Sequence, residues 1–251
     1  MKTVSIPENQ VDLNILRYGE DFRSESLPML ESYLSPDEKK EYQKRKLESG
    51  RWEFLLSRIF RRAVIADYLK KKMSFLRFGT QPEGKPFGEN FDLQFNTAHT
   101  DGIVALSLSR ESVGVDVEKI NPTARERFSL LAQRYFSPEE YRFWQAQPEA
   151  LKPGAFLRLF TLKEAHLKAL GCGLRFPLDR LNLPRVPEET FSQGAFHYFS
   201  ACLSEYHVSI ALFNPGRFWT RYRVNQFSAR SFVEYLGKKT SPLRFFESQM
   251  V

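Results

Sequence analysis

The chain has 251 residues, a formal net charge of +7 and two cysteines, Cys172 and Cys202. This length provides one large domain or two small ones with ample core. The cysteine count excludes a disulfide framework, and the absence of a signal-peptide core or a run of about 18 apolar residues predicts a cytoplasmic protein outside the membrane. The basic surplus favours nucleic acid, phosphate-bearing cofactors or acidic proteins as partners, without choosing among them.

In the first third of the chain, residues 1–33 predict a strand and a short helix. Ser35 followed by Pro36 and two acids predicts a helix running towards Glu48. Apolar periodicity from Trp52 to Leu69 predicts a longer amphipathic helix. Its polar side, expected to be a solvated face, carries four arginines: Arg51, Arg58, Arg61 and Arg62. The Gly- and Pro-rich stretch 79–90 predicts a loop.

Further along, strands are expected at 91–97, 103–109 and 112–120, the last two forming an antiparallel hairpin around a turn at 110–112. Helices are expected at 124–135, 138–147 and 157–170, and strands within 191–213. The second of these helices starts with Ser137-Pro138 and two acids, which repeats the earlier start at Ser35. Similarity between the two halves is too faint to establish an internal repeat from the residues alone.

The strand 112–120 has an unusual polar face. Its valines alternate with Gly114, Asp116 and Glu118, so the two carboxylates share one side of the strand, roughly 7 Å apart. Like charges at this spacing repel each other and do not favour a strand. Oxygen ligands so placed suit a hard cation such as Mg²⁺. From this segment alone, a polar strand face exposed to solvent is an equally good interpretation.

The helix 157–170 carries Glu164 and Lys168 four residues apart, on the face opposite its apolar residues. Gly171 and Gly173 end this helix. A carboxylate and an ammonium on one face can hold a metal ion and a phosphate side by side. By itself the pair is more often a surface ion pair worth a few tenths of a kcal/mol.

Together these segments resemble the signature of the 4′-phosphopantetheinyl transferases. Gly-Val-Asp-Val-Glu at 114–118 is followed by Phe-x-x-Lys-Glu-Ala-x-x-Lys-x-x-Gly-x-Gly at 160–173. Upstream, Gly-Lys-Pro at 84–86 and Phe-Asn-Thr-Ala-His-Thr at 95–100 match two further family pieces in order and spacing. The length resembles the large, pseudo-dimeric Sfp type. This implies an α+β fold of two similar halves related by a pseudo-twofold axis, with antiparallel sheets packed with helices.

The resemblance divides the chain into an N-terminal half (1–112), a C-terminal half with the metal-binding motifs (113–217) and an extension (218–251) without a functional account. It implies an enzyme that transfers the phosphopantetheine arm of coenzyme A to a serine of an acidic acyl or peptidyl carrier protein. This enzyme is expected to be cytoplasmic and monomeric, without membrane or nucleic-acid partners. The by-product would be 3′,5′-ADP. The reaction would require Mg²⁺, or Mn²⁺ in its place.

The same resemblance assigns roles to residues. Asp116, Glu118 and Glu164 are the expected metal ligands, and Glu164 or a water that it orients is the expected general base. Lys168 is expected to be catalytic and to contact the diphosphate. The full set expected to bind coenzyme A is Arg45, Lys85, Asn96, His99, Asp116, Glu164 and Lys168.

Three positions depart from the family pattern. Phe160 replaces the usual Trp, and Ala98 replaces the usual Ser, which removes a hydroxyl contact to a phosphate. The cation expected five residues after Pro36 is replaced by Glu41, so Lys40, Lys44 or Arg45 would have to contact the nucleoside 3′-phosphate.

Two other functions compete with this one. A Mg²⁺-dependent nuclease would explain acidic residues beside a lysine, but the order and spacing of Glu164 and Lys168 fit it poorly. A basic RNA-binding protein would explain the charge, yet the chain has no aromatic-Gly ribonucleoprotein motif. Degradation of plasmid DNA with Mg²⁺ would favour the first, and salt-dependent RNA binding without turnover would favour the second.

Overall fold

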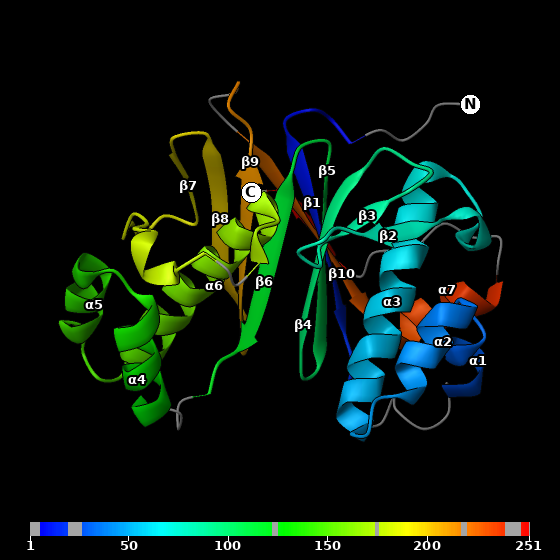
Figure 1. The fold of residues 1–251 in the computed structure, drawn as a ribbon, viewed down its shortest axis with the longest axis horizontal. Coiled ribbons are helices and arrows are strands. Elements are labelled where there is room, and N and C mark those ends of the chain that lie inside the picture. Colours follow the sequence, from blue (N-terminus) through cyan, green and yellow to red (C-terminus); the bar gives the residue numbers. More distant parts are fainter. Residues whose placement is uncertain are drawn as a thin grey trace.

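The structure, a computed structural model, describes residues 6–19, 27–121, 125–173, 176–216, 220–238 and 247–250. Figure 1 shows two lobes side by side, with strands towards the middle and helices on the two outer sides. Each lobe joins one main sheet to its own helices, which confirms the predicted α+β class. Within the described ranges, no helix is both long and apolar enough to cross a membrane.

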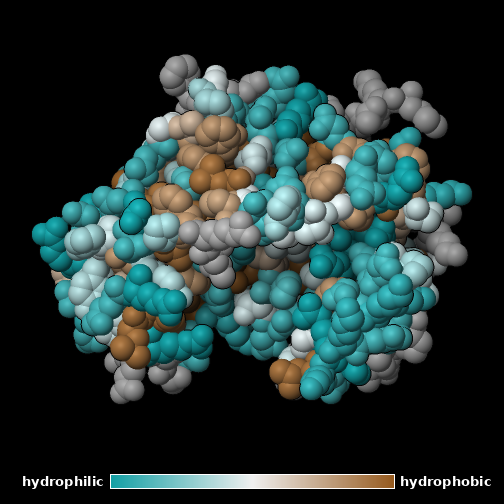
Figure 2. All heavy atoms as spheres, viewed as in Figure 1, coloured by the Kyte–Doolittle hydropathy of each residue, from teal (hydrophilic) through white to brown (hydrophobic). Residues whose placement is uncertain are grey.

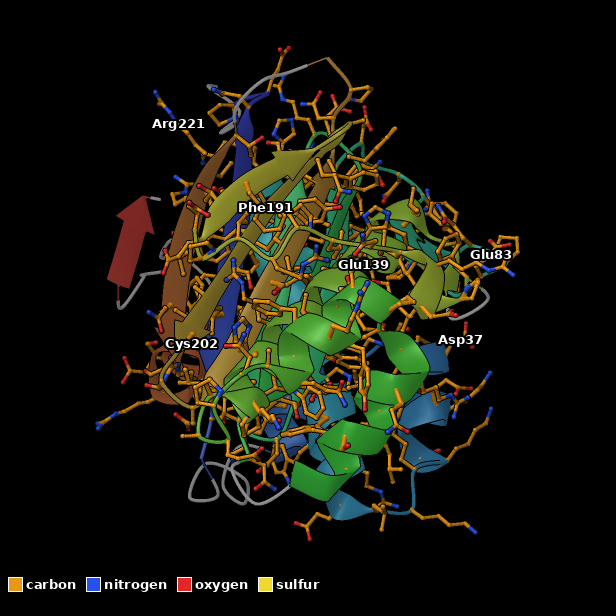
Figure 3. All side chains as sticks on the ribbon, turned by 90° about the vertical axis from the view of Figure 1, so that its left-hand side faces the viewer. Asp37, Glu83, Glu139, Phe191, Cys202 and Arg221 are labelled. Atoms are coloured by element: carbon orange, nitrogen blue, oxygen red, sulfur yellow. The ribbon has the colours of Figure 1, made fainter. Side chains whose placement is uncertain are left out.

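The first lobe contains a sheet with the strand order β11-β10-β1-β5-β4. Its strands are β1 (Gln10–Arg17), β4 (Gln94–Thr100), β5 (Ile103–Ser109), β10 (Arg221–Ser228) and β11 (Glu247–Met250). Strand β1 is parallel to β10 and antiparallel to β5. The segment expected as an extension therefore supplies two strands of this sheet, and Figure 3 shows β11 at its outer edge.

Helices cover the outer face of this sheet. They are α1 (Leu27–Glu31), α2 (Pro36–Gln43), α3 (Glu48–Leu69) and α7 (Ala229–Lys238). A 3₁₀ turn (Met73–Phe75) and a hairpin of β2 (Phe78–Thr80) and β3 (Pro86–Gly88) follow α3, where a loop was expected. Helix α2 begins as predicted: the Ser35 hydroxyl accepts from the Glu38 N–H, and the Glu38 carboxylate accepts from the Ser35 N–H.

The second lobe contains an antiparallel sheet with the order β6-β9-β8-β7. Its strands are β6 (Val113–Lys119), β7 (Thr190–Gln193), β8 (Phe196–Leu203) and β9 (Tyr206–Phe213). Its helices are α4 (Arg125–Tyr135), α5 (Pro138–Gln145) and α6 (Lys152–Leu170), with a 3₁₀ turn at Leu178–Arg180. In Figure 3 these helices lie in front of the strands.

The two sheets pack face to face and share one core. Leu13 and Ile15 from β1 pack in the same buried cluster as Val113, Val115 and Val117 from β6. Because side chains alternate along a strand, the opposite side of β6 faces α6. The apolar side of β6 thus joins the two lobes, and its polar side is left for the candidate site.

The predicted hairpin of strands 103–109 and 112–120 was wrong. Strand β5 pairs with β1 and β4, whereas β6 pairs with β9 in the other sheet. Residues 110–112 carry the chain from one sheet to the other. Alternation correctly identified both strands, but it contains no information about which strand lies beside which.

The predicted solvated face of α3 was also wrong at two positions. Arg61 is only 3% exposed and Arg62 only 9% exposed. The guanidinium groups of both lie near the Glu38 carboxylate, at N–O distances of 3.6 Å for Arg61 and 2.9 Å for Arg62. Arg62 also donates to the Leu76 carbonyl. These arginines fasten α2 to α3, because a buried cation requires such partners.

Candidate active site

The site begins where β6 touches α6, and Gly114 makes this contact. A Cβ atom at Gly114 would lie 2.0 Å from the Ala165 carbonyl oxygen and 2.5 Å from the Ala169 backbone nitrogen. No side chain fits at such distances. The missing side chain lets the strand and the helix approach closely, and this brings the next polar residue of β6, Asp116, to the charged face of α6.

Asp116 and Lys168 form an ion pair across this contact. The Lys168 Nζ donates to the Asp116 Oδ1 at 2.6 Å. Asp116 is only 6% exposed, and its other oxygen, Oδ2, is buried without a hydrogen-bond partner among the described residues. A buried carboxylate oxygen without a partner is costly, so this atom is available to a bound cation or donor.

Glu118 and Glu164 are close enough to Asp116 to be influenced by its charge. Burial raises the pKa of Glu118 to about 7, and the negative charge of Asp116 adds to the rise. Burial, followed by the charge of Asp116, also raises the pKa of Glu164. The raised pKa values of Glu118 and Glu164 beside the Asp116 carboxylate indicate a region of negative potential that a bound cation would relieve.

The side chains of the candidate site carry the oxygen ligands that a hard divalent cation prefers. They do not, however, form a complete set of ligands around one point. Within the described part of the chain, no three His, Cys, Asp or Glu side chains are grouped tightly enough to hold a metal ion. The donors are nevertheless carboxylate oxygens, one of which lacks a partner. Mg²⁺ is commonly held by one or two carboxylates, with water and substrate oxygens completing its shell, so a full protein cage is not needed.

On the side of the first lobe, His99 lies within electrostatic reach of Lys168. Burial lowers the pKa of His99 to about 4, and the positive charges of Lys168, Arg45 and Arg58 lower it further. The His99 Nδ1 lies 3.5 Å from a Glu53 carboxylate oxygen. Strand β4 thus brings His99, a predicted coenzyme A contact, into the same electrostatic neighbourhood as Lys168.

Arg45 and Arg58 lie against one aromatic ring. Their guanidinium carbons are 4.6 Å and 5.0 Å from the centre of the Phe54 ring. Burial lowers the pKa of Arg58, and the neighbouring positive charge of Arg45 contributes. Sequence reasoning placed Arg58 on the polar face of a helix, because linear spacing does not show that Arg45 packs against the same ring.

Arg58 also lines a cavity with a volume of about 850 Å³. This cavity lies between α2, α3 and the β2–β3 hairpin, and its wall carries charges of both signs, including Asp37, Glu41 and Arg77. Figure 2 shows that the surface is predominantly hydrophilic over the helices of this lobe and is hollowed between the two lobes. Glu41, the position where a cation was expected, forms an exposed ion pair with Lys44.

Two other predicted contacts have partners inside the protein. The Asn96 amide oxygen accepts a hydrogen bond from the Val115 N–H at 3.0 Å, which joins β4 to β6 beside Asp116. The Lys85 ammonium donates to the Ser112 hydroxyl and to the Ala169 carbonyl. The structure therefore gathers Asp116, Glu164 and Lys168 with His99 nearby, and places Asn96 and Lys85 at junctions between the lobes.

Comparison with known proteins agrees with this geometry. Residues 112–221 match the family model of the 4′-phosphopantetheinyl transferase superfamily. This segment of the chain is therefore similar to members of that superfamily. The matched segment contains the strand and the helix that supply all the carboxylates of the candidate site, together with Lys168.

Relatives extend the likeness into the first lobe. The 4′-phosphopantetheinyl transferase HetI of Nostoc sp. is 29% identical over 184 residues, which cover 71% of this chain and 76% of HetI. The transferase Sfp of Bacillus subtilis is 29% identical, with 61% of this chain and 66% of Sfp covered. The transferase gsp of Aneurinibacillus migulanus is 26% identical, with coverages of 76% and 73%. All three relatives are named 4′-phosphopantetheinyl transferases, and the likeness to HetI and gsp extends beyond residues 112–221.

Proposed function

We propose that this chain transfers the 4′-phosphopantetheine group of coenzyme A to a serine of an acyl or peptidyl carrier protein. The observation that carries the proposal is the meeting of Asp116 and Lys168 at the Gly114 contact, next to Glu164. Carboxylates beside an ammonium are the groups that a diphosphate and its counterion would require. The names of the matched relatives support the same reaction.

In this proposal, the serine hydroxyl oxygen forms a bond to the phosphorus that carries the pantetheine arm, and the bond from that phosphorus to the leaving 3′,5′-ADP oxygen breaks. Glu164 accepts the serine proton, directly or through a water molecule. Its raised pKa moves it towards the range in which a carboxylate is an effective general base. Lys168 stabilises the charge of the diphosphate.

Asp116, Glu118 and Glu164 are the residues that would hold Mg²⁺. The ion would neutralise diphosphate oxygens and thereby favour attack by a neutral hydroxyl. Arg45 and Arg58 would supply positive charge to the remaining phosphates of coenzyme A, since they lie within electrostatic reach of each other and of His99. His99, neutral because its pKa is lowered, would contribute a ring N–H as a hydrogen-bond donor. Arg58 is an addition to the predicted set, made necessary by the acidic residue at Glu41.

The proposed partner is an acidic carrier protein, because the net charge of +7 would speed its encounter with the enzyme. The proposed compartment is the cytoplasm, where the two free cysteines would stay reduced. The test is intact-mass spectrometry of several apo carrier proteins incubated with the enzyme, coenzyme A and Mg²⁺. A mass gain of roughly 340 Da that EDTA prevents would support the proposal, and no gain across a broad panel would refute it.

A further inference from the structure

The turn of the β2–β3 hairpin, which belongs to the first lobe, reaches the last turn of helix α6 in the second lobe. At its end, the Lys85 Nζ donates to the Ala169 carbonyl at 2.9 Å and to the Ser112 hydroxyl at 3.1 Å. The Ser112 hydroxyl in turn donates to the same carbonyl at 2.6 Å. Three groups from distant parts of the sequence thus form one closed hydrogen-bonded triangle.

The end of a helix is a favourable place for such a triangle. The last four carbonyls of a helix have no partner within it, and the partial negative charge there attracts a cation. Helix α6 ends at Leu170, so the carbonyl of Ala169 is one of these groups. Lys85 and Ser112 satisfy it with a charged and a neutral donor, and this fixes the backbone of the residue that follows Lys168.

A second, independent contact supports the docking of the hairpin. A Cβ atom at Gly171 would lie 3.2 Å from the Gln81 side-chain oxygen and 3.4 Å from the Lys85 Cδ, and one at Gly173 would lie 3.4 Å from the Glu83 carbonyl. Both glycines have positive φ angles, +72° and +60°. Glu83, labelled in Figure 3, projects outward while its backbone faces the glycines. The two glycines therefore shape a surface that receives the hairpin turn.

We propose that Lys85 is a positioning residue, and that with Ser112 it forms a latch holding the hairpin of the first lobe on the end of α6. The latch keeps the last turn of α6, and with it Lys168, in place opposite Asp116. In this role the Lys85 ammonium donates to the Ala169 carbonyl and to the Ser112 hydroxyl. The latch itself is independent of the proposed reaction, although its effect on turnover rests on that reaction.

The test is hydrogen–deuterium exchange of the ligand-free protein, comparing the wild type with Lys85→Met and Ser112→Ala. Loss of the charged donor should make amides in peptides covering 78–88 and 166–173 exchange about tenfold faster. Ser112→Ala should give a smaller increase in the same peptides. The matched control is Lys72→Met, at an exposed lysine, which should leave both peptides unchanged.

The alternative is that Lys85 serves as a phosphate ligand only. Unchanged exchange in both peptides of Lys85→Met and Ser112→Ala would overturn the latch, whatever the effect on coenzyme A binding. If Lys85→Met unfolds globally, as circular dichroism would reveal, Ser112→Ala decides the question alone. In an active enzyme, the latch predicts a lower kcat with a nearly constant KM for coenzyme A, whereas a pure phosphate ligand predicts a higher KM. Failure of carrier modification would leave the exchange result valid.

Discussion

Glu140 and Lys163 form a fully buried ion pair, with the Oε2 and Nζ atoms 2.5 Å apart and neither side chain exposed. The Glu140 carboxylate also accepts from the backbone N–H groups of Ser137 and Leu183. Lys163 precedes Glu164 directly on α6. The pair therefore ties the helix of the candidate site to the start of α5 and to the segment after α6, just as Glu38 ties α2 to the arginines of α3.

Lys163→Met should strongly destabilise the protein, since it leaves the Glu140 charge buried without its cation. Breaking such a pair typically costs about 3–5 kcal/mol of unfolding free energy. Urea unfolding followed by circular dichroism measures the loss. The double variant Glu140→Gln with Lys163→Met should be less destabilised than Lys163→Met alone, because the stranded charge is gone. Wild-type stability of the Lys163→Met variant would contradict this account of the ion pair.

Gly114→Ala should reduce transferase activity more than it reduces stability. The added methyl group would meet backbone atoms of Ala165 and Ala169, so β6 and α6 must move apart and separate Asp116 from Lys168. Carrier modification assays and thermal melts of the same preparation compare the two effects. Gly154→Ala, where a Cβ meets nothing within 4 Å, is the matched control and should leave activity unchanged, with stability equal or slightly higher because Gly154 lies within α6. Full activity in Gly114→Ala would show that the close approach is not needed.

Asp116→Asn should lower turnover by about three orders of magnitude or more while the protein remains folded, because it removes a charge that a divalent cation would require. Isothermal titration with Mg²⁺ and coenzyme A should show weaker cation binding. Asp101→Asn, at an exposed aspartate that pairs with Lys119, provides the control. Turnover close to that of the wild type in Asp116→Asn would remove this residue from the proposed site.

The stability contributed by Glu118 should decrease with rising pH in metal-free protein. Its pKa is about 7 in the folded protein against an ordinary 4.5, so the folded state binds more protons between these values. The contribution is therefore present below about pH 4.5 and is lost as the pH rises through 7. Melting temperatures of the wild type and Glu118→Gln in EDTA should diverge over this window, with the variant gaining relative stability. A pH-independent difference would contradict the assignment, and Mg²⁺ should narrow the divergence by stabilising the ionised carboxylate.

Local patterns predicted much of the fold and which of the candidate residues share one face of a strand or helix. Capping at Ser35 and Ser137 located two helix starts, and alternation in β6 placed Asp116 and Glu118 on one face. Helical spacing put Glu164 and Lys168 on the face opposite the buried Ala165 and its apolar neighbours. These predictions depend on distances of only a few residues, which strand and helix geometry fix.

The same local patterns could not predict contacts between residues that are far apart in the sequence. The crossing of the chain between sheets after β5, the burial of Arg61 and the engagement of Lys85 with Ala169 all depend on which surfaces meet. Periodicity shows that a residue lies on a polar face, but it does not show whether water, another lobe or a ligand covers that face. The pairing of β10 with β1 could not be predicted either, because no pattern within one segment shows which distant segment lies beside it.

The parallel pairing of β1 with β10 has a consequence for biosynthesis. Strand β1 lies in the interior of its sheet, yet one of its neighbours is made more than two hundred residues later. While the ribosome is still extending the chain, one edge of β1 offers unpaired backbone groups, and such edges invite contacts with other chains. Loop closure over so long a separation is also slow. We expect the first lobe to reach its final form only after β10 has been synthesised, and nascent chains that stall before residue 221 to be those that chaperones retain.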